Sequence, residues 1–129
     1  MSTGINVVIT KTARRKLVRA RAGDMTLPAI VGMAFGDGGV DGNDDVIPPS
    51  EDQTALNHEL IRKAASAHTY PEQTTCRYEC TLTESELAGK YISEIGLYDS
   101  AGDIVGIKNF TKKGKDGDME HTYWVDDIF

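Results

Sequence analysis

Hydrophobic and polar positions change their spacing about halfway along the chain, and this change predicts the order of the secondary structure. From residue 66 onward they alternate with a period of two, which is typical of strands with one buried face. Residues that favour turns separate five such segments. The predicted strands are Ser66–Tyr70, Thr75–Thr83, Tyr91–Asp99, Asp103–Phe110 and Glu120–Phe129, and the third and fourth form the clearest hairpin.

The first half of the chain predicts two helices and one strand. Thr10–Ala22 has apolar residues at helical spacing, a threonine able to cap its start, and Gly23 at its end. Thr54–Ala64 predicts a short internal helix, also capped by a threonine. Thr26–Gly36 is too rich in glycine for a helix, and its nearly continuous apolar residues favour a strand covered on both faces.

The element order is therefore helix, strand, loop, helix and an antiparallel run, which predicts an α+β fold dominated by β structure. We expect a small antiparallel β-sandwich with an N-terminal helix and one short internal helix. At 129 residues the chain is long enough for one ordinary hydrophobic core, so we expect a single domain over 1–129. Its parts are a basic helix at 10–22, an acidic loop at 37–52 and an antiparallel β region at 66–129.

Charge is distributed unevenly along the sequence. Residues 1–21 contain six basic residues and no acid, whereas the rest contains 8 basic and 20 acidic residues. The first segment therefore carries a charge of +6 and the rest of the chain carries −12, which together give the net charge of −6. Such a helix fits docking to a neighbouring subunit, docking within the fold, or a solvated face, and we favour the first. The expected docking residues are Lys11, Arg14, Arg15, Arg19 and Arg21, with Asp37, Asp41, Asp44 and Asp45 as an acidic counterpart.

Nucleic acid is a poor partner for this basic helix. The chain as a whole is acidic, which disfavours approach to a phosphate backbone. No aromatic residue interleaves with the basic residues of 11–21 to stack on bases. We therefore expect no nucleic-acid partner.

The acidic loop requires a test for calcium binding. Asp41, Asn43, Asp45 and Asp52 fall at positions 1, 3, 5 and 12 of a calcium loop. Position 6, where such loops need glycine for a sharp turn, is Val46. We expect a solvated, turn-rich loop, no metal and no cofactor. A stand-alone β module that binds Ca²⁺ or another ligand is the alternative function.

The sequence contains no arrangement of residues typical of an enzyme. Nucleophile-elbow, zinc-protease and P-loop motifs are all absent. Cys76 and Cys80 lie too far apart on one predicted strand for a disulfide, and they suit the core as small apolar groups. No apolar run approaches the roughly 20 residues of a membrane helix, and the N-terminal charges follow rather than precede an apolar run. We expect no enzymatic activity, no membrane partner and no signal peptide.

Several segments together resemble the N-terminal domain of phage tail-collar fibre proteins, the part that joins a fibre to the tail. The basic helix TKTARRKLVRARAGD leads into a strand that ends in the turn Gly36-Asp37-Gly38. Leu56–Arg62 resembles that family's L-x-N-E-x-x-R segment. The stretch ISEIGLYDSAGDIVG, residues 92–106, resembles a hairpin of the same family. Together these features extend over most of the chain.

The resemblance implies a structural component of a phage or of a phage-tail-like contractile particle. Its implied role is to dock a tail fibre to the tail or baseplate by protein–protein contacts. The implied partners are other tail or baseplate proteins and a fibre or receptor-binding subunit, and the implied oligomer is a homotrimer. The implied location is the virion tail or a tail-like particle, after synthesis in a bacterial cytoplasm.

Overall fold

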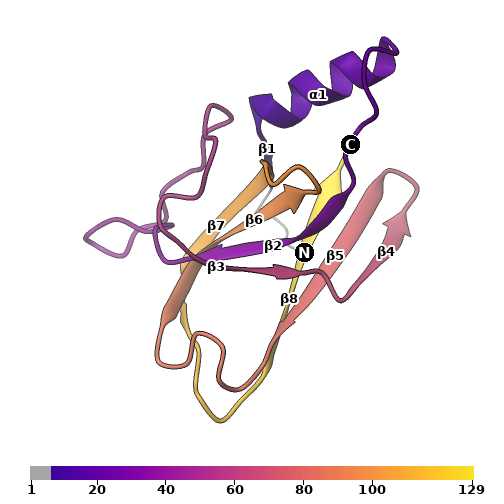
Figure 1. The fold of residues 1–129 in the computed structure, drawn as a ribbon. Coiled ribbons are helices and arrows are strands. Elements are labelled where there is room, and N and C mark those ends of the chain that lie inside the picture. The colour runs from indigo at the N-terminus through magenta and orange to yellow at the C-terminus, as the bar shows by residue number, and fades with distance from the viewer. Residues whose placement is uncertain (1–6) are drawn as a thin grey trace.

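The computed structural model describes residues 7–129 as two antiparallel sheets with one helix at one end (Figure 1). The larger sheet has the strand order β1-β7-β6-β2-β3, and the smaller has the order β4-β5-β8. The predicted β-dominated sandwich is thereby confirmed. The helix is α1, Lys11–Arg21, and the strands are β1 Val8–Ile9, β2 Ile30–Gly36, β3 Glu59–Ala64, β4 Ala67–Glu72, β5 Thr75–Leu82, β6 Tyr91–Asp99, β7 Ile104–Gly114 and β8 His121–Ile128.

The main hydrophobic core lies between the two sheets. In the large sheet, β2 and β6 pair so that Met33 lies opposite Leu97 and Phe35 lies opposite Ile95. All four side chains are buried, and the ring of Phe35 meets that of Tyr123 edge to face, with 5.3 Å between centroids. The small sheet contributes the buried residues Cys80, Leu82 and Val125 to the same cluster. The core position expected for Cys80 is therefore confirmed, whereas Cys76 is only half-buried; both cysteines are free thiols.

The outer face of the large sheet carries a second, smaller core, which is covered by the long segment between β2 and β3. Leu56 of this segment packs with Ala34, Ile104 and Ile107. A Cβ atom at Gly96 would lie only 3.0 Å from Leu56 Cδ2, so glycine at this position leaves the space that Leu56 fills. Burial on both faces explains why β2 is apolar at nearly every position.

A buried carboxylate holds both ends of the same segment. Glu94 on β6 is fully buried. Its Oε2 accepts hydrogen bonds from the amides of Gly38 and His58, both at 2.8 Å, and its Oε1 accepts one from the Asn57 amide at 2.8 Å. Three backbone donors thus replace the water that a carboxylate loses on burial.

The predicted internal helix at Thr54–Ala64 is wrong. Its second half is strand β3, which pairs with β2 at the edge of the large sheet. Its first half is irregular, because the amides of Asn57 and His58 donate to Glu94 rather than to carbonyls of a helical turn. Tertiary contacts therefore override a local helical pattern.

The hairpin between β6 and β7 has its turn at the predicted place. Asp99 Oδ1 accepts hydrogen bonds from the amides of Ala101 and Asp103 at 3.0 and 3.1 Å, which fixes the reversal. β7 continues to Gly114 rather than ending at Phe110 as predicted. The two-residue strand β1, which the sequence analysis missed, pairs with the edge of β7.

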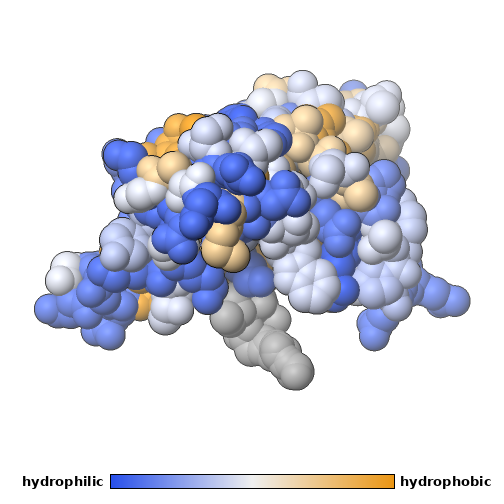
Figure 2. Space-filling model, turned by 90° about the horizontal axis from the view of Figure 1, so that it is seen from below, coloured by the Kyte–Doolittle hydropathy of each residue, from blue (hydrophilic) through white to orange (hydrophobic). Residues whose placement is uncertain are grey.

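Thr10 fixes the start of α1 against the large sheet. Its buried Oγ1 accepts a hydrogen bond from the Ala13 amide at 3.2 Å and donates one to the Ile104 carbonyl at 2.9 Å. Its amide donates to the Val105 carbonyl at 3.1 Å. α1 therefore lies at one end of the sandwich (Figure 1), while the face seen from the other end is covered mainly by hydrophilic side chains (Figure 2).

An ion pair joins the edge of the large sheet to the small sheet. Lys63 Nζ on β3 lies 2.6 Å from Glu86 Oε1 and donates to the Thr81 carbonyl of β5 at 2.7 Å. Hydrogen bonds from Lys63 and from the Thr83 amide lower the pKa of Glu86 from 4.5 to about 2. Because the folded state favours the charged form, this carboxylate contributes stability above pH 4.5 that is lost as the pH falls toward 2.

Glu94→Gln is expected to lower the free energy of unfolding by about 2–3 kcal/mol, because an amide group places a donor where three backbone donors need acceptors. Urea unfolding followed by circular dichroism measures the change. Glu120→Gln, at an exposed position, serves as the matched control and should leave the midpoint unchanged. Equal stability of the two variants would contradict the anchoring role of Glu94.

Glu86→Gln is expected to lower the free energy of unfolding by about 1 kcal/mol at neutral pH, since the pair is about one-third exposed and partly screened. The difference in unfolding free energy from the unsubstituted chain should shrink between pH 4.5 and pH 3, because the stabilisation that the charged Glu86 gives the folded state decreases over this range. Urea unfolding at a series of pH values tests this. A difference that stays constant down to pH 3 would refute it.

Candidate docking site on the N-terminal helix

The basic side chains of α1 divide into two groups according to their partners. Lys11, Arg14 and Lys16 lie within ion-pair distance of carboxylates of the same chain. Arg15, Arg19 and Arg21 are exposed and form no ion pair with any residue of 7–129. No side chain of α1 is fully buried, so the helix rests on the sandwich through a narrow contact.

Lys16 joins the middle of α1 to the tip of the β6–β7 hairpin. Its Nζ lies 2.6 Å from Asp99 Oδ2 and 2.6 Å from Asp103 Oδ2. The side chains of Lys16 and Asp99 are 15% and 2% exposed, so this pair is largely removed from water. Burial opposes the charge of Lys16, but hydrogen bonds to Asp103 and Asp99 outweigh it and raise the Lys16 pKa.

The first turn of α1 contacts the end of the acidic loop. Lys11 Nζ lies 2.6 Å from Asp52 Oδ1, and Glu51 lies 3.9 Å from both Lys11 and Arg14. The hydrogen bond and the attraction of Asp52 raise the Lys11 pKa. These side chains are all about half exposed, so water screens the contacts. The Lys11 amide also donates to the Glu51 carbonyl at 2.8 Å, which ties the loop to the helix.

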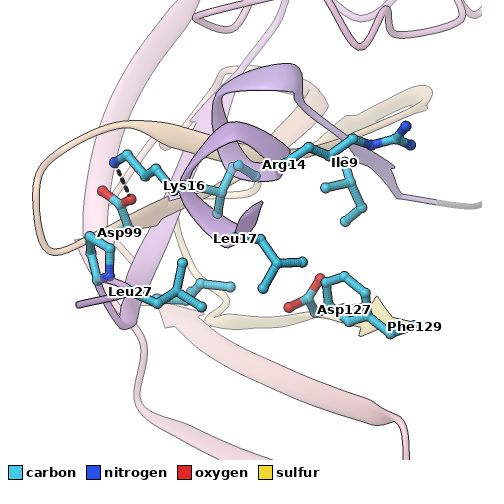
Figure 3. A pocket seen from close by; sticks show the side chains of 12 residues that line it. Ile9, Arg14, Lys16, Leu17, Leu27, Asp99, Asp127 and Phe129 are labelled. Carbon is cyan, nitrogen blue, oxygen red and sulfur yellow. Dashed lines mark hydrogen bonds and ion pairs between the residues drawn. The ribbon is translucent and has the colours of Figure 1, made fainter. Parts of the chain in front are cut away.

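An apolar pocket of about 210 Å³ opens beneath α1 (Figure 3). Six segments form its walls: α1 itself, the end of β1, the chain leading into β2, the end of β6, the start of β7 and the C-terminal end of β8. In Figure 3, Leu17 extends from α1 toward Asp127, and Leu27 lies below the helix on the chain that leads into β2. The lining residues are Ile9, Ala13, Arg14, Lys16, Leu17, Leu27, Pro28, Ile30, Asp99, Val105, Asp127 and Phe129.

Charged groups lie at the edges of this pocket. Arg14 borders it on the side of α1, and Asp127 faces it from the end of β8 (Figure 3). Burial raises the pKa of Asp127, and no cation of residues 7–129 lies within ion-pair distance of it. The pocket therefore has a cationic edge, an apolar interior and one partly desolvated carboxyl opposite.

The acidic residues predicted as a counterpart are dispersed along the loop. Asp37 contacts His58 Nδ1, and Asp44 lies 3.3 Å from Lys112 Nζ. Asp41 Oδ1 accepts hydrogen bonds from the amides of Asn43 and Asp45 at 2.8 and 3.1 Å, which shapes a turn. Among the acidic residues of this loop, Glu51 and Asp52 rather than the four predicted ones form the ion pairs with α1.

The residues considered for calcium are not gathered around one point. Asp52 pairs with Lys11, while Asp41, Asn43 and Asp45 belong to the turn at the other end of the loop. Within residues 7–129 no group of three or more His, Cys, Asp or Glu side chains is arranged to hold a metal ion. The structure offers calcium no preformed site in the part of the chain that it describes.

Sequence reasoning missed two features of this region. The predicted docking set does not include Lys16, although helical spacing puts it on the same side as Ala13, which packs against the core. The pocket was missed because Leu27 and Phe129 lie about a hundred residues apart in sequence. The docking role of Lys11, Arg14, Arg15, Arg19 and Arg21 stays a prediction.

Comparison with known proteins gives two matches. The family model described as "Phage tail-collar fibre protein, N-terminal" matches residues 1–123. The chain is 33% identical over 117 residues to a protein of Escherichia phage P2 described as a "Probable tail fiber protein". That alignment covers 89% of this chain but only 17% of the relative, so the chain spans about a sixth of that protein. No solved structure matches the chain at a significant level.

Lys16→Met is expected to lower the free energy of unfolding by about 2–3 kcal/mol, because it leaves the buried Asp99 carboxylate without a cation. Lys11→Met removes an exposed pair from the same helix and should have little effect. Thermal melts of the two variants measure the contrast. Similar melting temperatures for both would show that Lys16 does not anchor α1.

Proposed function

Since the chain belongs to the family of phage tail-collar fibre protein N-terminal domains, we propose that it docks a tail fibre to the tail or baseplate by protein–protein contacts. Membership of this family gives the chain a structural role in a phage tail. We further propose that the docking surface consists of α1 and the rim of the pocket beneath this helix.

The observation that carries this proposal is the set of exposed arginines on α1. Arg15, Arg19 and Arg21 form no ion pair with residues 7–129, although the chain outside residues 1–21 carries a charge of −12. A fixed helix that presents cations which its own acids do not neutralise suits an acidic surface on another protein. The partners we infer are tail or baseplate proteins and a fibre or receptor-binding subunit, in an assembly built on a homotrimer.

The proposed role requires no chemistry. The buried carboxylate of Glu94 and the Lys16–Asp99 pair hold segments of the fold together. No helix within residues 7–129 has the length and hydrophobicity needed to cross a membrane. We infer a component of a virion tail or tail-like particle without enzymatic activity.

The combined substitutions Arg15→Glu and Arg19→Glu are expected to leave the domain folded and to block its incorporation into tail particles. Both side chains are exposed, so the folded state loses little, whereas an acidic partner would now meet like charge. Quantitative immunoblotting of purified particles measures incorporation, and circular dichroism confirms folding.

The matched control is the double substitution Lys90→Glu and Lys113→Glu, which makes the same change in net charge at exposed positions outside α1. It should be incorporated like the unsubstituted chain. Full incorporation of the α1 variant would refute docking through the helix. Equal loss with both variants would attribute the effect to net charge alone.

A further inference from the structure

The pocket beneath α1 is an incompletely filled apolar space at the surface. Leu17, Ile9 and Ile30 approach it from the helix and from the large sheet. Leu27 is 47% exposed and Phe129 is 68% exposed, so two of its apolar walls remain open to water. Burying such surface against a partner would be favourable at about 25 cal/mol for each Å² removed from water.

The size of the pocket limits what can enter it. An apolar cavity of about 150 Å³ with similar walls accommodates a benzene molecule. At about 210 Å³, the pocket beneath α1 has room for one large aliphatic or aromatic side chain. It is too small for a second helix or strand to enter as a whole.

Charges at the rim restrict the occupant further. Arg14 lines the pocket, and Arg21 lies two helical turns further along the same side of α1. Arg21 has no ion pair within residues 7–129, and Arg14 has only a contact of 3.9 Å with Glu51. Asp127 faces the pocket from the opposite wall, so acidic groups of an occupant are favoured on the side of α1 only.

We propose that the pocket beneath α1 receives one apolar side chain of an acidic segment of a partner tail protein. The acidic residues on either side of that anchor pair with Arg14 and Arg21. This inference rests on the proposed docking function and names the chemistry that the partner brings. An apolar anchor in a desolvated pocket with charge pairs around it is the arrangement in which a few residues dominate binding.

The test substitutes the walls of the pocket and measures incorporation of the full chain into tail particles. Leu27→Gln should reduce incorporation by about tenfold or more, because the loss of one buried apolar contact of this size costs at least that factor. Leu27 is half exposed in the free chain, so its substitution leaves the fold intact. Leu17→Gln should act in the same direction, with thermal melts to separate any loss of stability.

Val18→Gln is the matched control, because Val18 is 66% exposed on the same helix and does not line the pocket. It should change incorporation by less than about twofold. Arg21→Glu should reduce incorporation, whereas Lys90→Glu, a single charge reversal away from the pocket, should not. An unchanged level with Arg21→Glu would overturn the acidic character of the partner segment.

The results separate this inference from the proposed function. If Leu27→Gln is incorporated normally while the Arg15/Arg19 reversal is excluded, α1 docks but the pocket has no role. If both are incorporated normally, docking through α1 fails as well. If Leu27→Gln instead dissociates an oligomer of the purified chain, as measured by its mass in sedimentation, the occupant is a second copy. That result also overturns the proposal.

Discussion

The contact on which the arrangement of the outer core depends is the buried carboxylate of Glu94. Three backbone amides from the two ends of the β2–β3 segment converge on it, so one side chain of β6 fixes where that segment leaves the sheet and where it returns. A Cβ atom at Gly38 would lie 2.8 Å from Glu94 Oε2, which is why glycine is needed beside the carboxylate. With its ends held, the segment lays Leu56 over the outer face of the sheet.

Much of the fold could be predicted from the sequence because its signals are local. The β6–β7 hairpin carries its own turn chemistry in Asp99, and α1 carries its own cap in Thr10. The failure at residues 54–64 has a non-local cause, since the amides that a helix would use donate to Glu94, about 37 residues away. The spacing of apolar residues within the segment cannot indicate such a distant partner. The local pattern therefore predicted a helix where the chain forms an irregular stretch followed by β3.

The candidate site was predicted less completely than the fold, again for reasons of distance along the chain. The charge of α1 is visible in sequence, but which cations are free depends on where Glu51, Asp52 and Asp99 fold back. Lys16 shows this clearly, because helical spacing indicates its side of α1, but only the folded hairpin places Asp99 2.6 Å from it. The pocket is harder still to predict, since six segments must come together before it exists.

The same contacts explain how a helix with no fully buried side chain can serve as a docking element. Thr10 fixes the start of α1 and Lys16 fixes its middle, so its orientation is set by polar anchors rather than by a broad apolar face. An element fixed in advance loses less conformational entropy when it binds than a mobile one. The acids nearest to α1 are used by Lys11, Arg14 and Lys16, and a partner therefore competes only with water for Arg15, Arg19 and Arg21. The largely buried pair of Lys16 with Asp99 holds the helix while Arg15, Arg19 and Arg21 face outward, so the helix is both fixed and available.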